Sequence, residues 1–214
     1  MSTFPGSPRL LKGGIAVLDP VSGAVLRVIN LQYNPDTLTR TLQIKGVGQE
    51  TGDRTEALRL KGPPGETIKV ELEIDATDMM ETSSGSGGLH SILAALEVLV
   101  YPSSDALRAN NESASFGTLE IIPTEASLTV FVFGPKRIAP VRFTELSITE
   151  EAFDASLNPI RAKVSLGMRV LTIDDVSFDE KSGSVFMSYL RAKEQLASEA
   201  TPGTLGALGI TGIR

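Results

Sequence analysis

The stretch TIKVELEIDATD, residues 67–78, alternates apolar and charged side chains as plainly as any part of this chain. Ile68, Val70, Leu72 and Ile74 fall on one face, with charged residues between them. Because successive side chains of a strand point to opposite faces, this pattern predicts a strand with one buried and one polar face. It favours a mainly β fold.

Weaker alternation and turn residues predict further strands on both sides of this stretch. The expected strands are 14–19, 24–33, 38–47, 119–123, 127–134, 137–153 and 159–172. Residues 48–66 combine charge, Gly and a Pro pair, so we expect a long loop there with a short extended piece at 58–60. Seven or more strands at hairpin spacing indicate an antiparallel sandwich or barrel.

One inserted helix is expected at about 88–100, where apolar residues recur at helical spacing before Pro102. The polar segment at 103–118 shows no such periodicity, and we expect a loop. A second helix is indicated within 184–200, where apolar residues again recur at helical spacing.

The chain is expected to form one domain with two extensions. Residues 1–12 are rich in Pro, Ser and Gly and are interpreted as an arm. The β domain is expected at 13–175, and residues 176–214 as a C-terminal helix with a Gly-rich extension. The tail from Ser182 onward could cap its own domain or insert into a neighbour.

Composition excludes several classes of site. The absence of Cys excludes disulfides, thiolate nucleophiles and zinc–cysteine centres, and a single histidine, His90, excludes a multi-histidine metal site. A net charge of −6 without any basic run argues against a nucleic-acid partner. No apolar run reaches the roughly 18 residues of a membrane span, and no signal peptide is visible, so we expect a cytoplasmic protein.

No catalytic constellation is visible in the sequence. His90 has no serine or paired carboxylate at a spacing that would form a dyad, and a surface or packing role is the simpler interpretation. The acidic residues near Asp75 and Asp174 lack the spacing of calcium loops. The Gly-rich SGSGG lacks the Lys of a phosphate-binding loop. We therefore predict no catalytic, cofactor or metal residues and no enzyme activity.

The stretch LQYNPDTLTR, residues 31–40, contains an abrupt break. Because Pro lacks an N–H and restricts the residue before it, Asn34-Pro35 predicts a corner between strands. The stretch resembles the FNP-x-x-L-x-R signature of the tube-like domain of contractile injection system proteins. KVELEIDATD, the helix GLHSILAALEVLVYP and the block from TVFVFG to SLGMRV continue the resemblance in order, over about residues 13–172.

The resemblance implies a phage tail-tube fold, an antiparallel barrel or sandwich with one helix that assembles into a hexameric ring. It implies a baseplate tube initiator that joins the inner tube to the baseplate hub or spike. The LysM module that many baseplate members carry is not recognisable here, which admits a cap adaptor that contacts the cap and sheath. On this basis we predict a subunit or ring interface that includes Asn34, Pro35, Arg40, Arg54, Arg59, Lys61, Glu66 and Arg161.

The residues themselves support the ring idea in part. Alternating charge on the strands could line a polar lumen, and exposed strand edges need protection that ring closure supplies. A ligand-binding β-barrel is the main alternative from another class, although 8 Phe, 3 Tyr and no Trp give little aromatic lining. A hydrolase is the other alternative, and it lacks a visible catalytic set.

Overall fold

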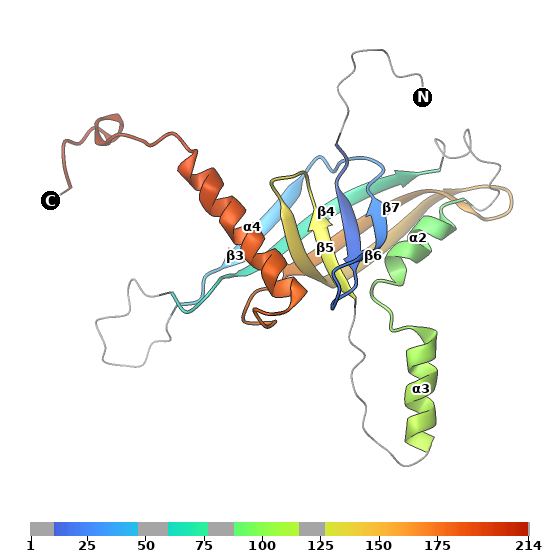
Figure 1. Ribbon diagram of the computed structural model, residues 1–214. Coiled ribbons are helices and arrows are strands. Elements are labelled where there is room, and N and C mark those ends of the chain that lie inside the picture. Colours follow the sequence, from blue (N-terminus) through green and yellow to red (C-terminus); the bar gives the residue numbers. More distant parts are fainter. Residues whose placement is uncertain (1–10, 47–59, 77–87, 116–126, 214) are drawn as a thin grey trace, which may run out of the picture.

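The computed structural model describes residues 11–46, 60–76, 88–115 and 127–213. In these ranges the chain forms seven strands, three α-helices and one short 3-10 helix (Figure 1). The strands are β1 (Gly14–Leu18), β2 (Val25–Asn30), β3 (Leu38–Gln43), β4 (Gly65–Asp75), β5 (Leu128–Val132), β6 (Ile138–Phe153) and β7 (Pro159–Val170). The helices are α2 (His90–Glu97), α3 (Ser104–Ser115), α4 (Lys181–Ser198) and η1 (Leu205–Leu208).

All seven strands belong to one antiparallel sheet with the order β2-β1-β5-β6-β7-β4-β3. The prediction of a mainly β antiparallel fold is confirmed. The sheet is not closed into a barrel, because β2 and β3 form its two edges and the described residues make no ladder between them. The expected strand at 119–123 and most of the loop at 48–66 lie outside the described residues.

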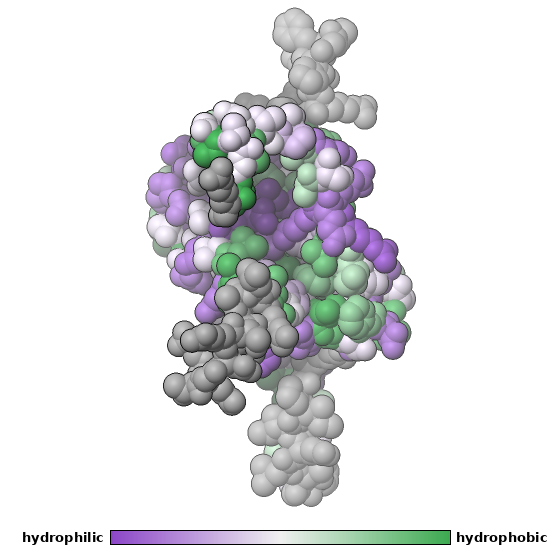
Figure 2. Space-filling model, turned by 90° about the vertical axis from the view of Figure 1, so that its left-hand side faces the viewer, coloured by the Kyte–Doolittle hydropathy of each residue, from purple (hydrophilic) through white to green (hydrophobic). Residues whose placement is uncertain are grey.

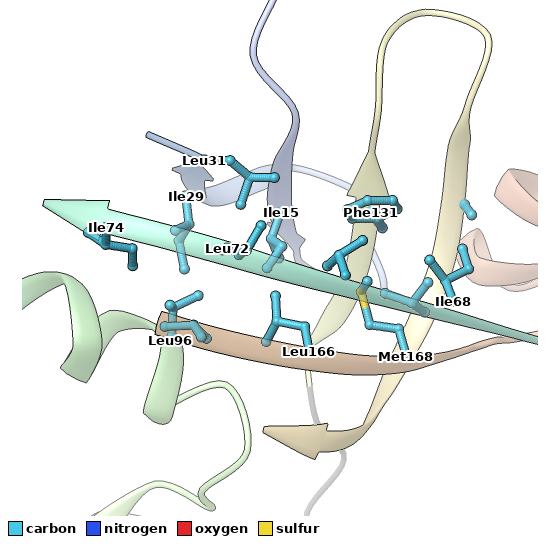
Figure 3. Packing of buried hydrophobic residues seen from close by; sticks show 14 of the residues in the cluster. Ile15, Ile29, Leu31, Ile68, Leu72, Ile74, Leu96, Phe131, Leu166 and Met168 are labelled. Carbon is cyan, nitrogen blue, oxygen red and sulfur yellow. The ribbon is translucent and has the colours of Figure 1, made fainter. Parts of the chain in front are cut away.

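The hydrophobic core lies inside the rolled sheet. Ile15 and Phe131 of β1 and β5 belong to the same buried cluster as Leu72 of β4 and Leu166 and Met168 of β7 (Figure 3). The alternation in β4 therefore corresponds to burial, as its sequence predicted. The buried side chains of this cluster fill the interior that the described strands and helices enclose.

Helices α2 and α4 pack against the core in different regions (Figure 1). Leu93 and Leu96 of α2 and Phe186 and Tyr189 of α4 are buried in the main cluster. The helices expected at 88–100 and within 184–200 are thus present, with shifted ends. Helix α4 packs on its own domain, which answers one question that the sequence left open.

The expectation of a loop at 103–118 was wrong for Ser104–Ser115, which forms helix α3. None of the described side chains of α3 is buried, so the sequence had no apolar stripe to reveal it. Local signals support the helix instead. The Ser103 hydroxyl accepts a hydrogen bond from the Ala106 N–H at 3.2 Å, and Asp105 lies in the first turn, where an acidic residue favours the helix dipole.

The Asn34-Pro35 corner connects the two edges of the single sheet, not two separate sheets. Before the corner, the Gln32 side-chain amide bonds to β4 as the backbone of a neighbouring strand would. Its Nε2 donates to the Asp75 carbonyl at 2.7 Å, and its Oε1 accepts from the Asp75 N–H at 2.8 Å. The β3–β4 ladder itself reaches only to Leu38 opposite Val70. Gln32 therefore fastens the chain from β2 to the far end of β4.

Replacing Gln32 with Leu is expected to lower the free energy of unfolding by about 1–2 kcal/mol, because two hydrogen bonds to the Asp75 backbone are lost in a partly buried place. Urea denaturation of the purified variant measures this. Gln43→Leu, on the exposed end of edge strand β3, is the matched control and should change stability by less than about 0.5 kcal/mol. Equal effects of the two substitutions would contradict the fastening role of Gln32.

Candidate functional site

One face of β4, β6 and β7 carries a continuous polar surface. In the strand registers, Glu73 of β4 lies opposite Lys163 of β7, which lies opposite Thr149 of β6. Two residues further along each strand, Glu71 of β4, Ser165 of β7 and Ser147 of β6 lie side by side. Small hydroxyl residues thus occupy the middle of this surface, with charges of both signs around them.

A hollow of about 580 Å³ lies on this polar surface. Residues Tyr33–Thr37 border it, so Asn34 and Pro35 stand at its rim. A second hollow of about 370 Å³ shares Tyr33, Glu73 and Lys163 with the first. In the view of Figure 2, hydrophilic residues floor a depression of the molecular surface, and residues of mixed hydropathy surround it.

Ion pairs join neighbouring strands across the polar surface. Arg161 Nη2 lies 3.1 Å from Asp75 Oδ2, and Lys163 Nζ lies 3.0 Å from Glu151 Oε1. Both basic side chains are about half exposed, so solvent screens both ion pairs and neither holds the strands together strongly. Arg161, predicted as an interface residue, therefore lies on an accessible polar surface and not in the core.

A different group, the Glu66 cluster (Arg40, Glu66, Tyr189 and Lys193), connects α4 to the sheet. The carboxylate of Glu66 accepts hydrogen bonds from Arg40 Nε at 2.7 Å, from the Tyr189 hydroxyl at 2.8 Å and from Lys193 Nζ at 2.6 Å. The Lys193 ammonium also lies 4.0 Å from the centroid of the Tyr189 ring. The Glu66 side chain is only 4% exposed, so the cluster is a buried, charge-assisted network.

Burial and hydrogen bonding shift the pKa of the Glu66 carboxyl in opposite directions. Burial alone would raise the pKa of its carboxyl, but the hydrogen bonds from Lys193, Arg40 and Tyr189 outweigh burial and hold this pKa below its ordinary value. Burial and the hydrogen bond to Glu66 both raise the pKa of the Tyr189 hydroxyl. At neutral pH Glu66 is therefore a carboxylate and Tyr189 a neutral phenol.

The two edge strands present backbone groups outward at alternate residues. Leu31 donates its N–H to the Gly13 carbonyl at 2.9 Å, which shows that Leu31, and by alternation Ile29, direct their backbone groups toward β1. Val28 therefore directs its N–H and C=O away from the sheet. Exposed apolar side chains accompany this edge, since Val25, Leu26 and Val28 are all more than half exposed.

The same reasoning applies to β3. The Asp75 backbone groups bond to the Gln32 side chain, whereas the Ala76 N–H donates to the carbonyl of Ile160 in β7. The backbone groups of even-numbered residues of β4 therefore face β7, and those of odd-numbered residues face β3. In β3, Arg40 and Leu42 pair with even-numbered residues of β4 and therefore direct their backbone groups outward. The sheet thus has two edges of similar, partly apolar character.

The six described members of the predicted interface lie in different surroundings. Asn34 and Pro35 border the polar hollow, whereas Arg40 and Glu66 meet in the cluster beneath α4. The Asn34 side chain binds its own chain: Oδ1 accepts from the Gly13 N–H at 2.9 Å and Nδ2 donates to the Leu11 carbonyl at 2.8 Å. Lys61 is exposed beside the Gly46–Leu60 bridge, and Arg161 lies on the polar surface. Arg54 and Arg59 lie outside the described residues.

Sequence reasoning missed Tyr189, Lys193 and Gln32. A partial signal was present for the cluster, because Glu66 is in phase with the buried Ile68 and Val70 of β4. A carboxylate at a buried position requires partners. Nothing in the sequence indicated that these partners would come from a helix more than 120 residues downstream.

The described residues offer no evident reactive centre. Within them, no three His, Asp or Glu side chains gather closely enough to hold a metal ion. His90 is exposed at the start of α2. Of the helices that the structure describes, none has both the length and the apolar character needed to cross a membrane. The arrangement can support binding between protein surfaces through the sheet edges, the polar face and the exposed helix α3.

Comparisons with known proteins add no family assignment. Neither a scan against protein-family models nor a search of curated proteins finds a match to this chain.

Proposed function

We propose that this protein is a non-enzymatic structural subunit of a phage-tail-like contractile injection particle and that it forms a hexameric ring at one end of the inner tube. The observation that carries this proposal is the open sheet, with two outward-directed edges and a polar face between them. An unprotected edge is a template for pairing with another chain. Pairing β2 of one copy with β3 of the next would protect both.

The polar surface supports the same proposal. In a ring, the face of β4, β6 and β7 would line the lumen with hydroxyl groups and charges of both signs, while the opposite face packs on the core. The resemblance of residues 13–172 to the tube-like domain gives the proposal its particular form. We favour the tube initiator, which contacts the inner tube and the baseplate hub.

A ligand-binding barrel is less well supported. The sheet is open, and buried side chains fill its interior. Both hollows on the described surface are bordered by charged and hydroxyl side chains, whereas small-molecule pockets are mostly apolar.

Native mass spectrometry of the purified chain tests the ring at micromolar concentration. A cyclic hexamer is expected, and a monomer throughout would contradict the proposal. Cryo-electron microscopy of particles from the native host then tests the position. Density beside the spike hub would support a tube initiator, density at the opposite end would replace it with a cap adaptor, and absence from the particle would contradict both.

A further inference from the structure

A short part of strand β4 has no backbone partner on its β3 side. The β3–β4 ladder ends where Leu38 lies opposite Val70, and further along the strand the Gln32 side chain bonds to the Asp75 backbone. Between these two contacts, Glu73 directs its N–H and C=O away from β7, as the other odd-numbered residues of β4 do. Neither group makes a hydrogen bond within the part of the chain that the structure describes. Strand β4 therefore has an unpaired edge at Glu73 between two places where it is paired.

Pro35 explains why the chain does not fill this gap itself. If the β3–β4 register continued beyond Leu38, Pro35 would lie opposite Glu73. A proline at that position has no N–H to donate to the Glu73 carbonyl. The chain bends at residues 32, 33 and 36, and residues 33–37 form no bridge with β4. The break at Asn34-Pro35 thus leaves the edge of β4 open.

The gap adjoins the larger hollow on the polar surface. Residues Tyr33–Thr37 form one border of this hollow, and Glu73 belongs to its lining together with the hydroxyl residues Ser147, Thr149 and Ser165. Its volume of about 580 Å³ lies within the range of protein binding sites for drug-sized ligands. The space beside Glu73 is therefore large enough for a short piece of another chain.

Gln32 shows which chemistry suits such an edge. Its carboxamide presents a donor and an acceptor side by side, and both bond to the Asp75 backbone, at 2.7 and 2.8 Å. Because alternate residues of a strand repeat their orientation, Glu73 presents the same two backbone groups to the same side. A complementary ligand must therefore offer an amide N–H and a C=O together, as a residue of an extended polypeptide does.

The charges around the gap favour a basic segment. Asp36, Glu71 and Glu73 contribute carboxylates to the lining of the hollow, whereas its described lining contains one cation, Lys163, which already pairs with Glu151. The Glu73 side chain is exposed on the polar face. A residue that pairs with Glu73 would place its own side chain next to this carboxylate. Lysine or arginine is therefore favoured there over aspartate or glutamate.

We propose that this hollow binds an extended, basic polypeptide segment from another protein, which pairs with Glu73 as a short added strand. Two backbone hydrogen bonds orient the segment, and the Glu73 carboxylate selects lysine or arginine at the paired residue. The site lies on a single copy of the chain and uses neither the β2 edge nor the β3 edge. The inference therefore goes beyond the proposed function and does not require the ring.

Solvent exchange of backbone amides tests the gap in the unbound chain. In TROSY NMR spectra of the deuterated, isotope-labelled chain, the Glu73 amide should exchange roughly tenfold or more faster than those of Leu72 and Ile74, which face β7. The difference should persist from micromolar to near-millimolar concentration. Equal protection of the three amides, or protection of Glu73 that grows with chain concentration, would mean that this chain fills the gap itself and would overturn the inference.

The binding probe is the capped tripeptide acetyl-Thr-Lys-Thr-amide. Saturable shifts of the Glu73 amide signal and slower exchange of that amide are expected. The same peptide with a methyl group on the lysine backbone nitrogen is the matched control, because it keeps the charge and lacks the N–H that would donate to Glu73. It should bind roughly tenfold more weakly, and acetyl-Thr-Glu-Thr-amide should also bind more weakly than the lysine peptide. Absence of saturable binding, or equal affinity of the lysine peptide and either control, would contradict the proposal.

Two variants locate the site. Ser165→Tyr places a large side chain in the lining of the hollow and should abolish peptide binding. Thr67→Tyr adds the same side chain to the same polar face, outside the lining of both hollows, and should leave binding intact. Retention with Ser165→Tyr or loss with Thr67→Tyr would place the binding elsewhere and reject the site. Native mass spectrometry of the same chain measures the ring separately, so peptide binding and the proposed function can each fail alone.

Discussion

A mixture of Val28→Pro chains with Leu42→Pro chains is expected to form a two-chain complex and nothing larger, while each variant alone stays monomeric. Both residues direct their N–H away from the sheet, so proline removes an edge donor without removing a hydrogen bond of the β1–β2 or β3–β4 ladder. A Val28→Pro chain keeps a usable β3 edge, and a Leu42→Pro chain keeps a usable β2 edge. One junction between them is therefore possible, but a closed ring is not.

Val28→Ala and Leu42→Ala are the matched controls, because they shorten the same exposed side chains and keep the N–H groups. Both should retain the assembly of the unmodified chain. Native mass spectrometry of each variant and of the mixture provides the measurement. A dimer formed by Leu42→Pro chains alone would indicate β2–β2 pairing and contradict a head-to-tail ring, and full rings from either proline variant would exclude edge pairing.

The strands were predictable because burial of one sheet face leaves a period of two in the sequence. In β4 and β7 the alternation is complete enough that both strands were predicted at nearly their observed positions. Closure was not predictable in the same way. Whether the ends of a rolled sheet meet depends on the path between β2 and β3, and the Gln32 side chain, not a backbone ladder, makes the contact there.

Helix α3 shows the limit of the same signal. Hydrophobic periodicity reflects burial of one helix face. None of the described residues of α3 is buried, so its sequence has no stripe of apolar residues at helical spacing. Only the Ser103 cap and Asp105 indicated it, and such short signals also occur in loops. The sequence indicated only part of the Glu66 cluster. Glu66 is in phase with the buried residues of β4 and therefore required partners, but only the packing of α4 on the sheet brings Tyr189 and Lys193 to it.

Glu66→Gln is expected to lower the free energy of unfolding by about 3 kcal/mol. The substitution keeps the shape of the side chain but replaces a buried carboxylate that accepts from Arg40, Tyr189 and Lys193. Arg40 and Lys193 are about 30% exposed and can recover part of their hydration, which limits the loss. Chemical denaturation measures the change. Glu71→Gln, an exposed carboxylate on the opposite face of β4, should change stability by less than about 0.5 kcal/mol.

The difference between the unmodified chain and Glu66→Gln should depend on pH in a defined direction. Because the folded state holds the pKa of Glu66 below its ordinary value, the stability from this carboxylate is present above the unfolded pKa of about 4.3 and is lost as the pH falls through the folded pKa. The raised pKa of Tyr189 acts at the other end: its contribution is present below about pH 10 and is lost as the pH rises through the raised folded value. Denaturation at pH 3, 7 and 9 should therefore show a Glu66→Gln deficit that is similar at pH 7 and 9 and smaller at pH 3. A deficit that stays constant down to pH 3 would show that the carboxylate charge does not stabilise the contact between α4 and the sheet.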